Sequence, residues 1–178
     1  MNLKVINKSK IKNFDSYMEK ARAIILNEKN EIYICNMNGS YQLPGGTIKN
    51  NEVPLETLKR ELKEELGLII NDNLEELIHI KYYHKQFPKY KSEGFDNRLN
   101  SVYYYLIHIN SNQINNSNFT DYEIANNIKI EVLKIAELKA LIKKSNSNID
   151  NKWKKFTDLE LESILNYYNV LTNKKNIL

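Results

Sequence analysis

Apolar residues recur in the chain with a helical period over one segment that is bounded at both ends. Four leucines follow one another at spacings of three and four, which places them on one face of a helix: Leu55, Leu58, Leu62 and Leu66. Pro54 suits a first helical turn, where its missing N–H has no intrahelical partner to lose. Gly67 suits the position just past the end, where glycine adopts the left-handed conformation most easily. We therefore predict an amphipathic helix from Pro54 to the residue before Gly67.

Runs rich in β-branched and aromatic residues predict strands on both sides of this helix. Residues 21–27 and 31–37 favour a strand pair around a polar turn, and three further strands are expected at 75–87, 98–109 and 128–135. The segment 88–97 contains Pro and Gly and is expected to be a loop or the end of a hairpin. The polar, low-complexity segment 110–121 is typical of a surface loop.

Two more helices are predicted after the last strand. Residues 136–145 form the first, and residues 158–171 form the second, which Thr157 is placed to cap. Strands interspersed with helices favour an α/β protein. No internal repeat or linker interrupts the 178 residues. We expect one domain over 1–178, with a core at about 18–145 and a C-terminal helix at about 157–171.

Composition narrows the classes of protein further. No apolar run approaches the ~18 residues of a membrane helix, and the polar start lacks a secretion signal, so we expect no membrane partner. The single cysteine, Cys35, allows no internal disulfide and agrees with a cytoplasmic location; it is expected to be a buried strand residue and not a nucleophile. The net charge of +4 is spread along the chain and falls short of a nucleic-acid footprint, although a basic face could attract nucleotides.

Three glutamates lie on the predicted helix, and their positions suggest a cation site. At about 100° per residue, Glu61, Glu64 and Glu65 fall within roughly a third of the helix circumference and turn partly away from Arg60. Carboxylates this close raise one another's pKa unless they are well solvated or bind a cation. Hard oxygen ligands select Mg²⁺ or Mn²⁺, which proteins commonly hold together with phosphate oxygens. The alternative is a solvated face whose glutamates pair with basic neighbours.

The spacing around the helix decides between these interpretations. Five residues separate Gly46 from Glu52, seven separate Glu52 from Arg60, and the positions that follow are filled in order by Glu61, Leu62, Glu64, Glu65, Gly67 and Leu68. This segment resembles the Nudix box of the Nudix (MutT-like) hydrolases. The resemblance includes the common lead-in, here Tyr41, Leu43, Pro44, Gly45 and Gly46. It implies a Nudix-type α/β/α sandwich around a mixed β-sheet.

The resemblance also implies roles for residues of the box. Glu61, Glu64 and Glu65 would coordinate divalent metal, Mg²⁺ or else Mn²⁺, with Glu64 and Glu65 as the firmest ligands. Arg60 would orient the acidic cluster through a charge-assisted hydrogen bond. Glu52 is expected to pair with Arg60 instead of touching metal. Gly46 would let the backbone approach the metal and could offer its carbonyl as a ligand, unless glycine is there for steric reasons alone.

Family members often add a glutamate from a loop before the last strand. Glu123 holds that place in this chain and is the candidate for an additional metal ligand or for the base. Asp121 or Glu93 could replace it, and Glu123 could equally be an ordinary loop carboxylate. The general base stays open among Glu61, Glu64 and Glu123, with Glu61 preferred as the ligand least committed to metal.

The implied reaction is hydrolysis of a phosphoanhydride bond in a nucleoside diphosphate linked to a group X. A metal would neutralise the diphosphate and activate a water, and a carboxylate would take the proton. Oxidised nucleoside triphosphates and nucleotide sugars are candidate substrates. An RNA 5′ pyrophosphohydrolase is an alternative within enzymes, and a Nudix-fold nucleotide sensor without turnover is the alternative outside them. A homodimer is possible.

Aromatic residues on two strands could bind the base of a nucleotide. Tyr82, Tyr83, Phe87 and Tyr103 to Tyr105 lie on the strands at 75–87 and 98–109, where alternation sends some to a substrate face and the others to the core. Tyr83 and Tyr103 are the substrate-binding candidates from this set. Arg98 could contact phosphate or a base edge, or be a solvated arginine. Trp153 is expected to anchor the last helix or to cover a pocket.

Overall fold

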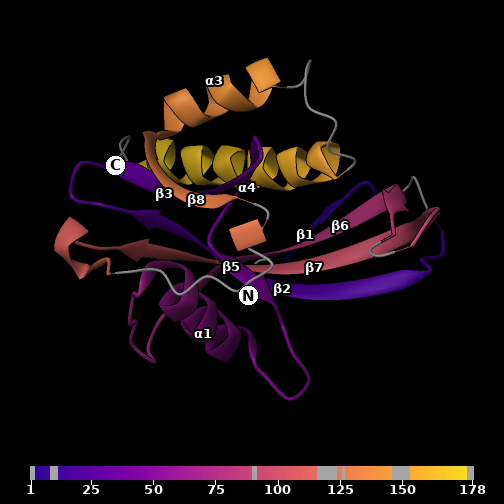
Figure 1. The fold of residues 1–178 in the computed structure, drawn as a ribbon, viewed down its shortest axis with the longest axis horizontal. Helices are drawn as coiled ribbons and strands as arrows, with labels where there is room; N and C mark the ends of the chain where they lie inside the picture. Colours follow the sequence, from indigo (N-terminus) through magenta and orange to yellow (C-terminus); the bar gives the residue numbers. More distant parts are fainter. Residues whose placement is uncertain are drawn as a thin grey trace.

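The chain folds into three layers in a computed structural model that describes residues 3–8, 12–89, 92–115, 124–125, 127–145 and 153–175. A mixed sheet lies in the middle, with one helix below it and two above it in the view of Figure 1. The predicted α/β/α sandwich is therefore confirmed. None of the helices in the described ranges is both long and apolar enough to cross a membrane.

Eight strands of the described residues form the sheet in the order β1-β6-β7-β2-β3-β4, with β5 paired to β2 and β8 paired to β3. Pairing is parallel for β1 with β6 and for β2 with β7, and antiparallel elsewhere. The strands are β1 Leu3–Ile6, β2 Ser16–Leu26, β3 Glu31–Met37, β4 Ser40–Gln42, β5 Gly45–Thr47, β6 Glu76–Pro88, β7 Phe95–His108 and β8 Ile128–Lys134.

Helix α1 spans Pro54–Leu66, as its leucine spacing and its two boundary residues predict. Gly67 adopts the left-handed conformation at φ 60° and its N–H donates to Lys63 O at 3.1 Å, which closes the C-terminus. Leu58, Leu62 and Leu66 are fully buried and pack against residues of β2 and β7, including Ala21 and Ile107. This packing fixes α1 to the lower face of the sheet.

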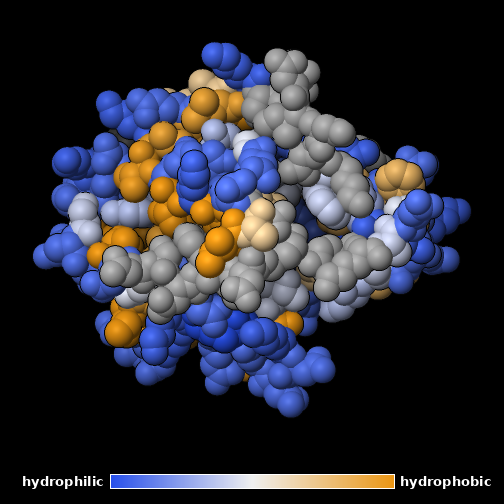
Figure 2. Space-filling view, in the orientation of Figure 1, coloured by the Kyte–Doolittle hydropathy of each residue, from blue (hydrophilic) through white to orange (hydrophobic). Residues whose placement is uncertain are grey.

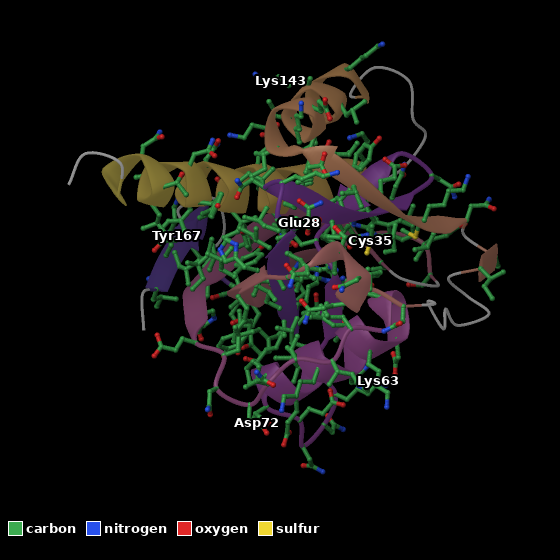
Figure 3. All side chains as sticks on the ribbon, turned by 90° about the vertical axis from the view of Figure 1, so that its left-hand side faces the viewer. Glu28, Cys35, Lys63, Asp72, Lys143 and Tyr167 are labelled. Carbon is green, nitrogen blue, oxygen red and sulfur yellow. The ribbon has the colours of Figure 1, made fainter. Side chains whose placement is uncertain are left out.

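Helices α3 (Ile135–Ser145) and α4 (Lys154–Lys175) cover the other face. Their buried residues Leu138, Ile142, Leu161, Ile164 and Leu165 join one cluster with Ile24, Ile34, Tyr82 and Tyr104 of the sheet. The two faces therefore have separate apolar cores, one under α1 and one under α3 and α4. Figure 3 shows the same layers from the side, with Lys63 on α1, Cys35 on the sheet and Lys143 and Tyr167 on the upper helices.

The prediction that Thr157 caps the last helix is wrong. Helix α4 begins at Lys154, three residues before Thr157. The carbonyl of Trp153 accepts the N–H groups of Phe156 at 2.9 Å and Thr157 at 3.1 Å, so Thr157 lies inside the first turn. Trp153 also donates its indole N–H to Pro88 O at 3.2 Å, which agrees with its expected role as an anchor. The Thr157 hydroxyl donates to Lys154 O at 2.9 Å, inside the first turn.

Strands β2 and β7 are longer than their apolar runs predict, whereas β6 has the predicted length and is shifted by one residue. Strand β2 starts at Ser16 and not at residue 21, because β7 pairs with it from Ser16 opposite Arg98 to Leu26 opposite His108. Strands β6 and β7 also extend into the predicted loop at 88–97, since Pro88 pairs with Phe95. Backbone pairing thus carries these strands through polar residues. Of the predicted surface loop at 110–121, residues 116–121 lie outside the described ranges.

The surface in the same view is mostly hydrophilic, and apolar residues gather on the left over β3 and β8 (Figure 2). Strand β3 is buried along most of its length and holds Cys35 inside, as predicted. Strand β8 pairs with β3 from Glu31 opposite Lys134 to Met37 opposite Ile128. The end of this pair, at Met37 and Ile128, forms one wall of the cleft described next.

Candidate active site

Residues 43–46 lead from β4 into the start of β5, and we call them the glycine loop. Its two consecutive glycines lie directly against β2 and against Glu61. Gly45 has φ 124°, and a Cβ there would lie 2.2 Å from the carbonyl oxygen of Ala21. A Cβ on Gly46 would lie 2.3 Å from Cδ of Glu61. Backbone pairing with β2 therefore requires glycine at 45, whereas a side chain at 46 would displace the Glu61 carboxylate from its position.

Arg60 gathers three carboxylates, which we call the Arg60 cluster. Its guanidinium binds both oxygens of Glu52, at 2.9 and 3.0 Å, so the predicted Glu52–Arg60 pair is confirmed. Its Nη1 also contacts Glu61 Oε1 at 2.6 Å and Glu64 Oε2 at 3.5 Å. The expectation that the glutamates turn away from Arg60 is therefore wrong for Glu61 and Glu64, because the long arginine side chain reaches both.

Hydrogen bonds keep the Glu52–Arg60 pair charged. Arg60 and then the Thr57 hydroxyl, 2.6 Å from Oε2, lower the pKa of Glu52 to about 2. The bonds from Glu52 in turn raise the pKa of Arg60 above its ordinary value. Both groups are therefore ionised at any pH near neutrality, and one end of the guanidinium stays attached to the loop.

Glu65, one helical turn after Glu61, binds the backbone next to Gly46. It is only 6% exposed, and its Oε2 accepts the N–H of Gly45 at 2.8 Å. The Cys35 thiol lies 3.6 Å from its Oε1. Glu65 thus ties α1 to the glycine loop and to β3, whereas Glu61 and Glu64 meet at Arg60.

The Arg60 cluster offers carboxylate oxygens, which are the kind of donor that a hard divalent cation takes. Within the described ranges no group of three or more Asp, Glu, His or Cys side chains is placed to hold a metal ion. Glu61 and Glu64 both contact Nη1 of Arg60, so two carboxylates meet at one guanidinium nitrogen. Carboxylate oxygens at such a position suit Mg²⁺ or Mn²⁺, and the missing side chain of Gly46 leaves Glu61 against bare backbone.

A cleft of about 390 Å³ opens beside these glutamates. It lies between the glycine loop and the β3–β8 pair, and residues of both signs line it together with apolar ones: Arg22, Cys35, Met37, Gln42, Gly45, Gly46, Thr47, Lys49, Glu61, Glu65 and Ile128. Its volume is in the range of small-molecule sites. Cations that suit phosphate and an apolar wall that suits a base therefore meet within one cleft.

Sequence reasoning missed Arg22, Gln42, Lys49 and the Met37–Ile128 wall. Arg22 could have been found, because a single arginine inside the apolar run ARAIIL needs a partner for its charge. It donates to Gln42 Oε1 at 2.8 Å, to Gly45 O at 3.3 Å and to the carbonyl of Leu43. Arg22 therefore supports the glycine loop from behind.

Arg98 is not brought to this cleft. It pairs with Ser16, whereas Gly46 pairs with Ala21, five residues further along β2, which is about 17 Å at the rise of a strand. Its guanidinium lies 4.2 Å from the centre of the Phe87 ring and donates to Ser16 Oγ at 2.9 Å. A role for Arg98 in binding substrate stays a prediction.

The two tyrosine candidates lie on β6 and β7 outside the lining of the cleft. Tyr103 and Gly46 both pair with Ala21, from opposite sides of β2. The Tyr103 ring stacks on His79 at 4.2 Å and its hydroxyl donates to Glu19 at 3.2 Å. Tyr83 is partly exposed and pairs with Leu99. Their contribution to substrate binding stays a prediction.

The downstream carboxylates were predicted as a further ligand or base. Glu123 and Asp121 lie outside the described residues. Glu93 lies exposed in the turn between β6 and β7, beyond Arg98 and away from the glycine loop. Among the candidates in the described ranges, the cleft thus contains Glu61 and Glu65, with Glu64 beside them at Arg60.

Comparison with known proteins agrees with this geometry. A family model for the NUDIX domain matches residues 17–153. The chain is 35% identical over 80 residues to an RNA pyrophosphohydrolase of Mannheimia succiniciproducens, over 44% of this chain and 38% of that protein. It is 36% identical over 72 residues to an 8-oxo-dGTP diphosphatase of Haemophilus influenzae, over 36% of this chain and 53% of that protein.

The chain thus spans about two fifths of the length of the first of these curated relatives and about half of the second. Among solved structures, a mutator MutT protein from Bacillus halodurans is similar with a TM-score of 0.46 and 19% identity, over 70% of this chain and 72% of that one.

Proposed function

The chain belongs to the Nudix family, and from this premise we propose that it is a Mg²⁺-dependent hydrolase of a nucleoside diphosphate linked to a group X. The observation that carries the proposal is that Glu61 and Glu64 meet at Nη1 of Arg60, beside a cleft of about 390 Å³ that has the size of a small-molecule site.

Different residues of the site would bind the metal, contact the phosphates, contact the base and keep Arg60 in position. Glu61 and Glu64 would hold the divalent ion, which supplies charge neutralisation and an activated water when bound. Arg22 and Lys49 line the cleft and would face the phosphates, while Met37 and Ile128 offer an apolar wall to a base. If a divalent ion took Glu61 and Glu64 from Nη1 of Arg60, the two bonds from Arg60 to Glu52 would still hold the guanidinium in place.

The reaction adds water across one P–O–P bridge. Water forms a new bond to one phosphorus, the bridging oxygen leaves with the other, and a carboxylate takes the proton of the attacking water. Glu61, which lies against Gly46, is our candidate for that base, with Glu64 and Glu123 as the alternatives. The products would be a nucleoside monophosphate and X-phosphate, or pyrophosphate when X is itself a phosphate.

Two substrate classes stand first because of the relatives that share the matched stretch. One is named 8-oxo-dGTP diphosphatase and the other RNA pyrophosphohydrolase. We propose the small nucleotide, an oxidised nucleoside triphosphate or a nucleotide sugar, because the cleft of about 390 Å³ has the size of such a ligand. A cytoplasmic location and a homodimer stay predictions.

The test is release of phosphate or nucleotide from a panel of substrates with Mg²⁺ or Mn²⁺. The panel contains nucleoside triphosphates, oxidised deoxynucleoside triphosphates, nucleotide sugars, ADP-ribose, dinucleoside polyphosphates and 5′-triphosphorylated RNA. Glu64→Gln is the variant, and Glu75→Gln, which removes an exposed carboxylate after α1, is the matched control. Metal-dependent cleavage of one class that is lost only in Glu64→Gln is the expected result. Nucleotide binding without any cleavage would favour the sensor.

A further inference from the structure

Helix α4 lies immediately beyond the segment that the family model matches, yet it packs on the sheet and forms hydrogen bonds to its strands. The matched segment ends at residue 153, and α4 starts at Lys154. Its first turns contact four strands through polar side chains and backbone. Thr157 bonds to Ser40 on β4 at 3.0 Å, and Glu160 reaches β2, β6 and β7.

Glu160 lies at the centre of a buried group of polar side chains with Lys20, His84 and Asn100, which we call the Glu160 cluster. His84 lies 2.8 Å and the Asn100 amide 2.6 Å from its Oε1, and the Lys20 ammonium lies 3.4 Å from its Oε2. Burial opposes ionisation of this carboxyl, but Lys20, His84 and Asn100 outweigh it and hold the pKa of Glu160 well below its ordinary value. The carboxylate therefore pins α4 to three strands at once.

The Glu160 cluster adjoins the residue that supports the glycine loop. Lys20 and Arg22 are two residues apart on β2, so their side chains leave the same face of the sheet. Arg22 bonds to Gln42 and to the carbonyls of Leu43 and Gly45. Through these bonds one face of β2 joins Glu160 of α4 to the loop that precedes Gly46.

A second route runs through β4. The Thr157 hydroxyl bonds to Ser40, the first residue of β4, and β4 ends at Gln42, directly before the loop. A cavity of about 10 Å³, which is room for one water, lies where the two routes meet. Arg22 and Gln42 line both this cavity and the reaction cleft, whereas Thr157, Glu160 and Leu161 close the cavity from α4.

We propose that Glu160 and Thr157 of α4 are positioning residues for the proposed active site: they hold Arg22 and Gln42, and so set the glycine loop against Glu61 and Glu65. The inference rests on the proposed function for its catalytic consequence, but the ordering of the loop is independent of any substrate. It gives α4 a role in positioning the proposed active site, although none of its residues lines the cleft where a nucleotide would bind.

The test compares two isosteric substitutions on neighbouring turns of α4. Glu160→Gln removes the carboxylate that binds the sheet. Asp158→Asn is the matched control, because Asp158 is equally buried, at 6% exposure, and pairs with Lys154 of its own helix. Hydrogen exchange of the backbone amides of Gln42, Leu43, Gly45 and Gly46 is measured in each variant of the whole 178-residue chain, at equal temperature and corrected for global stability. The Gly45 amide is the most informative, since it donates to Glu65.

We expect exchange at Gly45 to be about tenfold faster in Glu160→Gln than in Asp158→Asn, because the loop opens locally when its support is lost. On an identified substrate, kcat should fall in Glu160→Gln with KM nearly unchanged. Equal exchange in the two variants would overturn the proposal. Absence of turnover in every form, with the exchange difference present, would overturn the hydrolase and leave the positioning of the loop supported.

A second pair of variants decides the matter if Glu160→Gln does not fold. Thr157→Val keeps the shape of the side chain but loses the hydroxyl that bonds to Ser40, and Thr157→Ser keeps that hydroxyl. Faster exchange at 42–46 in the valine variant, restored in the serine variant, is the expected result. The same exchange in both would show that Thr157 only fills space.

Discussion

Two carboxylate clusters on opposite faces of the sheet show how the proposed active site differs from a structural cluster. In the Arg60 cluster three carboxylates share a single guanidinium, and the side chains of Glu61 and Glu64 are 15% and 41% exposed. In the Glu160 cluster one carboxylate is surrounded by Lys20, His84 and Asn100, and the His84 side chain is 1% exposed.

The difference lies in charge balance and access. The Arg60 cluster keeps an excess of negative charge where solvent and ligands can reach it, so a divalent cation would be stabilised there. The carboxylate of the Glu160 cluster is already fully matched and buried, so a further ion would gain nothing and would have to be desolvated. The first arrangement suits exchange of ligands, and the second suits holding elements together.

The largest effect is expected from Lys20→Met, which breaks the Glu160 cluster. Removing the ammonium leaves a buried carboxylate without its counter-ion, and the free energy of unfolding should fall by about 3 kcal/mol. Urea denaturation followed by circular dichroism measures it. An unchanged midpoint would mean that the pair is solvated in solution, and the contrast between the two clusters would then disappear.

Arg60→Lys should affect activity more than stability. Lysine keeps the charge but cannot bind Glu52 through two nitrogens while it contacts Glu61 and Glu64. We expect turnover or metal affinity to fall by about 10- to 100-fold. Steady-state kinetics across a Mg²⁺ titration measures both, and the thermal midpoint serves as the control for folding. A loss of folding instead of activity would make Arg60 a structural residue like Lys20.

Gly46→Ala tests the contact between the loop and Glu61. The added Cβ would lie 2.3 Å from Cδ of Glu61, so the carboxylate must move, while the backbone can stay. We expect turnover to fall by about tenfold with the fold retained. Gly45→Ala is the comparison, because its Cβ meets backbone and should lower the thermal midpoint instead. Identical behaviour of the two variants would contradict the separate roles of the two glycines.

The pH dependence of stability should report on Glu52. Because its pKa is lowered from 4.5 to about 2 by Arg60 and Thr57, its ionised form stabilises the folded state above pH 4.5, and this contribution is lost as the pH falls toward 2. The stability difference between the parent protein and Glu52→Gln should therefore be constant from pH 7 to 5 and shrink below 4.5. A difference that stays constant down to pH 3 would show that the carboxylate is not paired in solution.

Thr57→Val is expected to have the smallest effect. The variant removes one hydroxyl, which donates to Glu52 at 2.6 Å, from a fully buried site of the same shape. The free energy of unfolding should fall by about 1 kcal/mol, and kcat should not change, because Arg60 still holds Glu52. A large loss of kcat would place Thr57 within the functional part of the Arg60 cluster.

Much of the site could be predicted because its signal is local. Pro54, the four leucines and Gly67 predict α1 with the right boundaries, and the resemblance to the Nudix box led to the correct pairing of Glu52 with Arg60. The N-terminal half of β2 and the start of α4 were not predicted, because pairing with β7 and the carbonyl of Trp153 determine them. Local propensity does not report on such partners.

The sequence by itself determined the family, helix α1 and the placement of Glu61, Glu64 and Glu65 on that helix. The reason is that the positions involved lie between Gly46 and Leu68 and are related by the geometry of one loop and one helix. Only the tertiary structure decided that Glu65 accepts the N–H of Gly45, and that Lys20, His84 and Asn100 meet Glu160. The physical reason is that these contacts depend on the order and register of β6, β7 and β2, which bring residues up to 140 positions apart within hydrogen-bonding distance.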